Sequence, residues 1–146
     1  MIGVFAWIVL LLPLAAAIVL SLPGGEPSRP FSRVLGVAPI AAAFAFAVAI
    51  FGVLLSRAEE DRLVLSSLWE WIAIGDVTVD LALQVDALSV LMSLVITGVG
   101  ALIFLYSVEY MDHDRDYRRF FAEMNFFVFA MLLLVLAANF VFLIVG

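Results

Sequence analysis

The chain has 146 residues, of which 66% are hydrophobic and 14% charged, and its mean hydropathy is +1.24. Soluble globular domains are far less apolar and far richer in charge, so this composition excludes a water-soluble monomer. The 7 basic and 13 acidic side chains give a net charge of −6, which argues against nucleic acid as a partner, because polyanion binding needs a basic surface. With no Cys, the chain cannot build a disulfide, an iron–sulfur cluster or a thiolate zinc site, and its single histidine, His113, cannot build a metal site alone.

Long uncharged segments predict membrane-spanning helices. A helix needs about 20 apolar residues to cross the hydrocarbon core, and residues 2–22, 34–55 and 87–108 each meet this length without a charge. The run over 120–146 is longer than one span needs, and Asn139 is a residue type that caps helices. We therefore expect a fourth span over 120–137 and the start of a fifth helix from Asn139. Because that start would stop in mid-membrane, we expect a longer protein.

The arginines predict how the spans are oriented. Loops rich in Lys and Arg tend to face the cytoplasm. The first and third loops together hold five arginines, and the second loop holds two: Arg29, Arg33, Arg115, Arg118 and Arg119 against Arg57 and Arg62. The first and third loops are therefore expected on the cytoplasmic side, with the amino terminus and the second loop on the opposite side.

The second loop contains a predicted β-hairpin over residues 69–85. An aromatic and β-branched run leads to Gly75-Asp76, and apolar residues then alternate with polar or small ones up to Val85. Alternation beyond a two-residue Gly-Asp turn is typical of a hairpin. An isolated hairpin is marginal in water, so we expect this one to lie on the membrane surface or a partner, with Trp69 and Trp71 at the interface. The alternative is a disordered acidic loop.

The run EYMDHDRDYRRFF separates the third and fourth spans. If it were helical, Asp114 could pair with Arg118 and Asp116 with Arg119, because residues three or four apart share a helix face. We interpret His113 as a solvated loop residue.

Two groups of residues are candidates for a role inside the membrane. Glu123 and Asn125 enter the fourth span, and Glu123 is either a surface carboxylate paired with Arg119 or a proton entrance. The third span carries a stripe of small residues on one helix face, which we interpret as a helix-packing face: Ser89, Ser93, Thr97 and Gly100. We find no catalytic, cofactor-binding or metal-binding set in the sequence.

The stretches LWEWIAIGDVTVDLALQVDALSVLMSLVITGVGALIFLYSVEYM and YRRFFAEMNFFVFAMLLLVLAANFVFLIVG resemble one family. They are similar to the amino-terminal part of the L (chain 5) subunit of proton-translocating NADH:quinone oxidoreductase, respiratory complex I. The resemblance implies an antiporter-like membrane subunit whose first helices are scaffold, with the first loop cytoplasmic and a hairpin on the opposite face. It also implies that the family's channel Glu and Lys residues lie beyond Gly146, so no channel residue is transferred. Phe104 and Ala138 stand where the family often has His and Asp.

The expected fold is an all-α integral membrane protein with four transmembrane helices, the start of a fifth and a small extramembrane β-hairpin. The resemblance implies a membrane-arm portion of complex I in a bacterial-type inner membrane or equivalent, with other membrane-arm subunits and the lipid bilayer as partners. It also implies that NADH, flavin, iron–sulfur clusters and quinone are bound by partner subunits, and that this chain carries no catalytic residue. The alternatives are a large subunit of a multisubunit cation/proton antiporter, a membrane subunit of an energy-converting hydrogenase, or a small non-catalytic membrane protein.

Overall fold

The computed structural model describes residues 2–22, 29–56, 64–74, 77–113, 115–138 and 144, with the backbone alone described for residues 29, 64, 66–74 and 77–81. Four helices are separated by one antiparallel hairpin: α1 (Ile2–Ser21), α2 (Arg29–Leu55), β1 (Val64–Ile74), β2 (Val77–Val85), α3 (Ala87–Tyr110) and α4 (Tyr117–Leu136). Each helix is long and apolar enough to cross a membrane. The predicted all-α membrane fold with one hairpin is confirmed in these elements.

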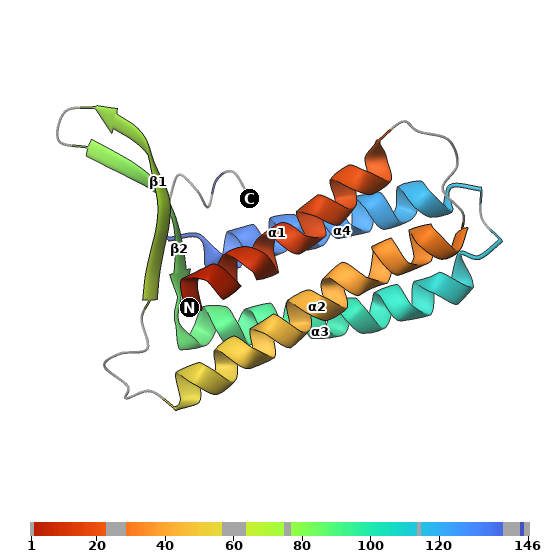
Figure 1. Ribbon diagram of the computed structural model, residues 1–146, viewed down its shortest axis with the longest axis horizontal. Coiled ribbons are helices and arrows are strands. Elements are labelled where there is room, and N and C mark those ends of the chain that lie inside the picture. Colours follow the sequence, from red (N-terminus) through yellow and green to blue (C-terminus); the bar gives the residue numbers. More distant parts are fainter. Residues whose placement is uncertain are drawn as a thin grey trace.

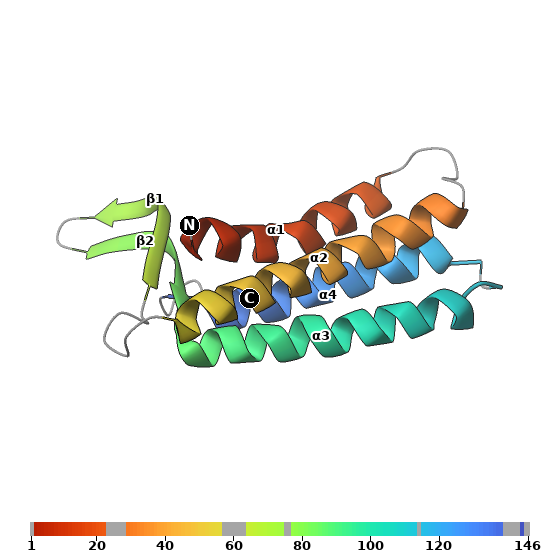
Figure 2. The ribbon, with the colours of Figure 1, turned by 60° about the horizontal axis from the view of Figure 1, so that its bottom comes forward.

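The four helices form a single bundle (Figures 1 and 2). Consecutive helices run in opposite directions, α1 lies beside α2 and α4, and α3 lies beside the same two helices. The hairpin projects from the end of the bundle where α1 begins, which we call the hairpin end. The opposite end, where α1 and α3 finish and α2 and α4 begin, carries Arg33, Arg115, Arg118 and Arg119, and we call it the arginine end. The expectation that the first and third loops share one side is therefore met.

The helices extend further than the uncharged runs indicated. α2 begins at Arg29, five residues before the predicted 34 (34 − 29), and α4 begins at Tyr117 and not at 120. Charge ends the part of a helix that sits in hydrocarbon, but the backbone hydrogen-bond ladder continues into the polar interface. α4 ends at Leu136 because Ala137 turns extended, with ψ 124°, close to the predicted break. The fifth helix expected from Asn139 lies outside the described residues, except for Ile144, which is helical.

The hairpin is longer than expected on its first strand. Val64 pairs with Val85 and Ile74 with Val77, and the register shifts twice between these pairs. The Gly75-Asp76 turn and the side chains of Trp69 and Trp71 lie outside the described residues, so the turn type and their interfacial position stay predictions. The other edge of β2 is met by the residues after α4, because the Ala138 amide donates to the Ala82 carbonyl at 3.2 Å. The hairpin is thus tied to the end of α4.

The segment between α3 and α4 is not helical in its described part. Residues 111–113 and 115–116 form turns, and Asp114 lies outside the described residues. Asp116 is the N-cap residue of α4, and its charge acts on Arg119 in the first turn of that helix, in line with the expected Asp116–Arg119 pair. The chain reverses direction here between the antiparallel helices α3 and α4, and the residues that form this turn cannot also belong to one continuous helix. His113 is exposed in this turn, as expected.

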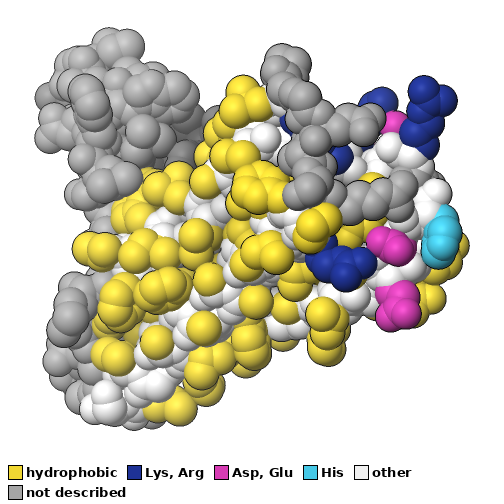
Figure 3. Space-filling model, turned by 45° about the vertical axis from the view of Figure 1, so that its right-hand side comes forward, with side chains coloured by type: hydrophobic (Ala, Val, Ile, Leu, Met, Phe, Trp, Pro, Cys, Tyr) yellow, Lys and Arg dark blue, Asp and Glu magenta, His cyan; other side chains and the backbone are white. Residues whose placement is uncertain are grey.

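Burial follows the logic of a membrane protein. Each helix places small or apolar residues inward at helical spacing, as in α2, where Gly36, Ile40, Ala43 and Ala47 are buried. The outer surface is also apolar, with large side chains such as Leu102 and Leu105 more than 60% exposed. Figure 3 shows hydrophobic side chains over most of one face and charged side chains gathered toward one end. Lipid accounts for this pattern, because water would not tolerate so large an exposed apolar surface.

The junction between β2 and α3 is fixed by a capping box. The Ser89 amide donates to the Asp86 carboxylate at 2.7 Å, and the Asp86 amide donates to the Ser89 hydroxyl at 2.9 Å. Partial burial raises the pKa of Asp86, but hydrogen bonds from Ser89 and Gln84 outweigh it and hold the pKa below its usual 3.8. Because the folded pKa is depressed, this contribution to stability is present above the ordinary pKa and is lost as the pH falls through the folded value.

Asp86→Ala should destabilise the protein by about 1 kcal/mol, because it removes the acceptor for the first turn of α3. Asp86→Asn keeps a capping oxygen and is the matched control, with a much smaller expected loss. Equilibrium unfolding in detergent micelles measures both variants. Equal losses for Ala and Asn would mean that the cap contributes nothing and that the carboxylate charge alone matters.

Candidate functional site

The interior of the bundle is the first candidate site. Among the described residues, no three or more His, Cys, Asp or Glu side chains are close enough to hold a metal ion. The buried polar side-chain groups of the described residues are hydroxyls, one amide and an indole N–H: Ser32, Ser89, Ser93, Thr97, Ser107, Tyr117, Asn125 and Trp7. These groups hold no charge at neutral pH, so they can pack and hydrogen-bond but supply no buried carboxylate, imidazole or amine.

The predicted small-residue stripe of α3 lies in this interior. Ser89, Ser93 and Thr97 are 6%, 3% and 0% exposed. Ser93 donates to the Ser89 carbonyl at 2.8 Å, and Thr97 donates to the Ser93 carbonyl at 2.6 Å. Each of these two hydroxyls is therefore satisfied by its own helix and needs no water or partner helix. The stripe presents a smooth surface on which other elements can pack closely.

Glycine completes that surface at the contact with α2. A Cβ added at Gly100 would lie 2.7 Å from Cδ1 of Ile40, and one added at Gly98 would lie 2.9 Å from Cε2 of Phe44. Cβ atoms do not approach other atoms so closely, so a larger residue at either position would require the Ile40 or Phe44 side chain to shift. The arrangement is what small residues provide in membrane helix pairs.

A second close approach joins α2 to α4, across the bundle. A Cβ added at Gly36 would lie 2.6 Å from Cδ1 of Phe121, whose side chain is fully buried. The amide nitrogen of Asn125 donates to the Gly36 carbonyl at 3.1 Å and to the Phe121 carbonyl at 2.9 Å. Asn125 is 0% exposed, and its side-chain oxygen has no hydrogen-bond partner among the described residues. This polar contact fixes the height of α4 against α2.

The sequence analysis did not single out Gly36 or Phe121. A glycine in a helix otherwise rich in Ala and Val is a weak sign of close packing, and it could have marked Gly36. Asn125 was noted only as a polar residue inside the span. Its partner is a backbone carbonyl of another helix, and a backbone carbonyl cannot be identified as a partner from residue types in the sequence.

The arginine end is the second candidate site. Arg33 pairs with Asp112 at 3.1 Å and so joins the start of α2 to the turn after α3. Arg118 donates to the carbonyls of Leu20 and Leu22, at the end of α1. The last carbonyls of a helix have no N–H donor within that helix, and a positive charge is favourable beside them. Side chains from α2 and α4 thereby hold the neighbouring segments together at the arginine end.

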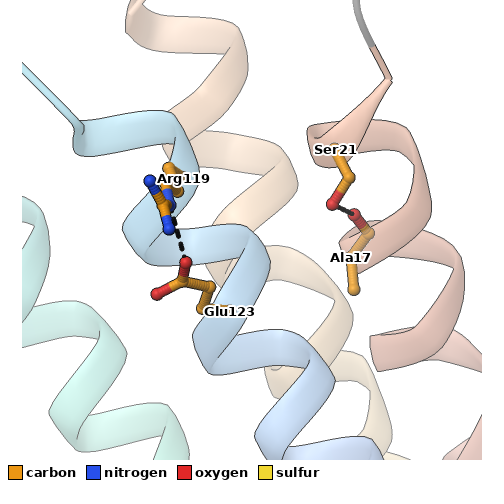
Figure 4. A network of polar contacts seen from close by, with 4 residues as sticks. All are labelled: Ala17, Ser21, Arg119 and Glu123. Carbon is orange, nitrogen blue, oxygen red and sulfur yellow. Dashed lines mark hydrogen bonds and ion pairs between the residues drawn. The ribbon is translucent and has the colours of Figure 1, made fainter.

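Glu123 lies on the outside of α4 near this end (Figure 4). It accepts a hydrogen bond from Nε of Arg119 at 2.7 Å, which is the pair that the sequence analysis considered, and its side chain is 66% exposed. Across from this pair, on α1, Ser21 donates to the Ala17 carbonyl at 2.7 Å. The exposed geometry fits a surface ion pair, which contributes little stability.

Four membrane-length helices with a polar but uncharged interior define the chain as a segment of a multi-pass membrane protein. Residues 71–121 match the family model described as the amino terminus of chain 5 of NADH-ubiquinone oxidoreductase, complex I. The chain is thus similar to the amino-terminal part of that subunit, as the sequence analysis expected.

The relatives extend this similarity to nearly the whole chain. NADH-quinone oxidoreductase subunit L of Mycobacterium tuberculosis is 42% identical over 142 residues, covering 97% of this chain and 22% of the relative. The subunits L of Pseudomonas aeruginosa and Escherichia coli are 41% and 36% identical over 137 residues, covering 93% and 94% of this chain and 22% of each relative. The chain therefore spans about a fifth of the length of these relatives.

Gly36→Ala should destabilise the protein by about 1–3 kcal/mol, because the new methyl group would overlap the Phe121 ring. Gly52→Ala on the same helix is the control, since a Cβ there meets nothing within 4 Å and should stabilise the helix by up to about 1 kcal/mol. Thermal unfolding in detergent compares the two variants. Equal midpoints would show that α2 and α4 are not in close contact at Gly36.

Ser93→Leu should disrupt packing of the stripe. Ser93 borders a cavity of about 10 Å³ between the helices, which cannot hold the added carbons of leucine, so we expect a loss of about 1–3 kcal/mol. Ser93→Ala keeps the small volume and removes a hydroxyl that bonds only its own helix, so its loss should be small. The yield of folded protein in membranes and its unfolding in detergent measure both. A larger loss for Ala would assign the hydroxyl, not the size, as the important property.

Proposed function

We propose that this chain is the amino-terminal membrane portion of an L or chain 5 subunit of a proton-pumping NADH:quinone oxidoreductase. The similarity over 97% of the chain to a subunit with that name carries the proposal. The matched relatives named above are all oxidoreductase subunits, so the antiporter and hydrogenase alternatives are not favoured. Proton translocation coupled to electron transfer is the activity of the whole complex in this proposal.

Within that complex, we propose that the chain acts as framework. The Asn125 contact joins α2 to α4, and the hydroxyls of α3 bond to their own helix and leave a small surface for packing, so both support a closely packed bundle. In this proposal NADH, flavin, iron–sulfur clusters and quinone are bound by partner subunits, and the lack of Cys in the sequence supports this for the iron–sulfur clusters. Other membrane-arm subunits and the bilayer are the proposed partners.

The proposed location is a bacterial-type inner membrane or an equivalent energy-transducing membrane. The arginine end faces the cytoplasm in this proposal, because loops rich in arginine are retained there, and the amino terminus and the hairpin then face the opposite side. Cysteine labelling at His113 and at Gly75 from either side of sealed vesicles tests this orientation. Labelling of His113→Cys from the outside of right-side-out vesicles would reverse it.

Purification of the whole protein from its native membrane tests the proposed function. An affinity tag should retain a large assembly that oxidises NADH and reduces quinone. An assembly that exchanges sodium for protons without NADH would support the antiporter reading. Hydrogenase activity would support the third alternative.

Glu123→Gln should leave NADH-driven proton uptake by inverted vesicles unchanged, because an exposed carboxylate paired with Arg119 is a surface group. His113→Ala, at the exposed turn, is the matched control and should be equally silent. If Glu123→Gln stops proton uptake while the complex still assembles and oxidises NADH, Glu123 is the proton entrance and not a surface ion pair.

A further inference from the structure

The outside of the bundle carries a groove between α1 and α4. It has a volume of about 430 Å³, within the range of ligand pockets, roughly 300–1,000 Å³. Figure 4 shows Ala17 and Ser21 of α1 and Glu123 of α4, which are three of its lining residues. Its lining is mostly apolar: Leu14, Ala17, Ile18, Ser21, Leu22, Ala122, Glu123 and Phe126. The groove lies on membrane-length helices, so its apolar part is placed to take up a hydrocarbon chain.

The groove opens into a charged hollow at the arginine end. This second hollow has a volume of about 480 Å³ and shares Ser21, Leu22, Ala122 and Glu123 with the groove, so the two are continuous. Three arginines and two acids lie around it: Arg115, Arg118, Arg119, Asp116 and Glu123. The hollow therefore carries a net positive charge of one (3 − 2) next to an apolar channel.

Two of the arginines are placed to receive an anion. Arg115 is exposed at the rim of the hollow. Arg119 donates Nε to Glu123, its side chain is 77% exposed, and its guanidinium carries two further amino groups that can donate hydrogen bonds. A guanidinium can donate two parallel hydrogen bonds to phosphate. Arg118 instead donates to the carbonyls at the end of α1 and forms part of the lining of the hollow.

We propose that this groove binds an anionic phospholipid, with one acyl chain between α1 and α4 and the phosphate on Arg115 and Arg119. A phospholipid fits because the apolar groove is continuous with the hollow that contains the guanidinium groups. An acyl chain joined to a phosphate has the same order of apolar and charged parts. Basic hollows between membrane helices bind anionic head groups in this way. The inference goes beyond the framework role and does not depend on which enzyme contains the chain.

The head group supplies the selectivity. Acyl chains are as well solvated by other lipids as by the groove, so the apolar part gains only packing and cannot distinguish one phospholipid from another. The two guanidinium groups can, because each basic side chain at the surface favours an anionic lipid by about fivefold. Glu123 works against this preference, since it holds one of the two arginines.

Binding of defined lipids to the delipidated protein in detergent tests the proposal. We expect phosphatidylglycerol to bind at least about tenfold more tightly than phosphatidylcholine, as followed by native mass spectrometry. A phosphatidylglycerol with a photoreactive acyl chain should cross-link within residues 14–22 and 122–126. Glycerol phosphate should not compete, because it lacks the chain. Equal binding of the two lipids, cross-links elsewhere, or full competition by glycerol phosphate would each overturn the proposal.

Matched variants locate the site. Arg115→Gln with Arg119→Gln should remove the preference for phosphatidylglycerol, whereas Arg33→Gln at the same end should keep it, because Arg33 pairs with Asp112 and lines neither compartment. Glu123→Gln should tighten binding by about fivefold, because it releases Arg119. Equal losses in the Arg33 variant would indicate diffuse attraction and overturn the site.

A bulky residue should close the groove. Ser21→Phe places a ring where the two compartments meet and should lower binding of phosphatidylglycerol at least about tenfold. Val19→Phe, on an exposed position of the same helix outside both linings, is the control and should bind normally. Both positions are exposed, so folding is retained, and unfolding midpoints equal to wild type verify this. If Ser21→Phe binds as wild type, the groove does not hold the chain.

Discussion

The structure depends on one constraint: hydrocarbon offers no hydrogen bonds, so every polar group inside the membrane must find its partner within the protein. The hydroxyls of Ser93 and Thr97 meet this constraint within their own helix, and the side-chain nitrogen of Asn125 meets it across α2 and α4. These contacts leave the facing surfaces small and smooth. Close packing at Gly36 and Gly100 is then possible, and van der Waals contact replaces the hydrophobic effect, which is absent between helices in lipid.

Length and charge made much of the fold predictable. Uncharged runs located all four helices, and strand alternation located the hairpin, because both signals depend on residue type alone. The helix starts at Arg29 and Tyr117 were missed, because the backbone hydrogen bonds of a helix continue beyond the hydrocarbon core into the polar interface. The contacts of Gly36, Phe121 and Arg118 were also out of reach. They depend on the rotation of each helix about its axis, and these helices are apolar on the lipid side and the inner side alike.

The two ends of the bundle are held by different means. At the hairpin end, hydrogen bonds of backbone amides hold the elements together. The Ser89 amide donates to the Asp86 cap at the start of α3, and the Ala138 amide after α4 donates to β2. At the arginine end, long side chains bridge separate segments, as Arg33 does to Asp112 and Arg118 does to the end of α1. Guanidinium groups can reach the polar interface from inside a span and still bind carbonyls. The arginines thus tie the neighbouring segments together, and the proposed lipid site uses two of them, Arg115 and Arg119.

The described interior is poorly suited to carry protons and well suited to block them. A proton path needs ionisable groups or connected waters near the middle of the membrane. The described residues place hydroxyls and one amide there, and the cavity beside Ser93 measures about 10 Å³, room for one water at most. In a proton-pumping complex, a path is useful only if its surroundings do not leak. Ser93 and Thr97 bond to their own helix, and Asn125 joins α4 to α2, so these groups support a closely packed wall, which is the contribution that the framework role assigns to this chain.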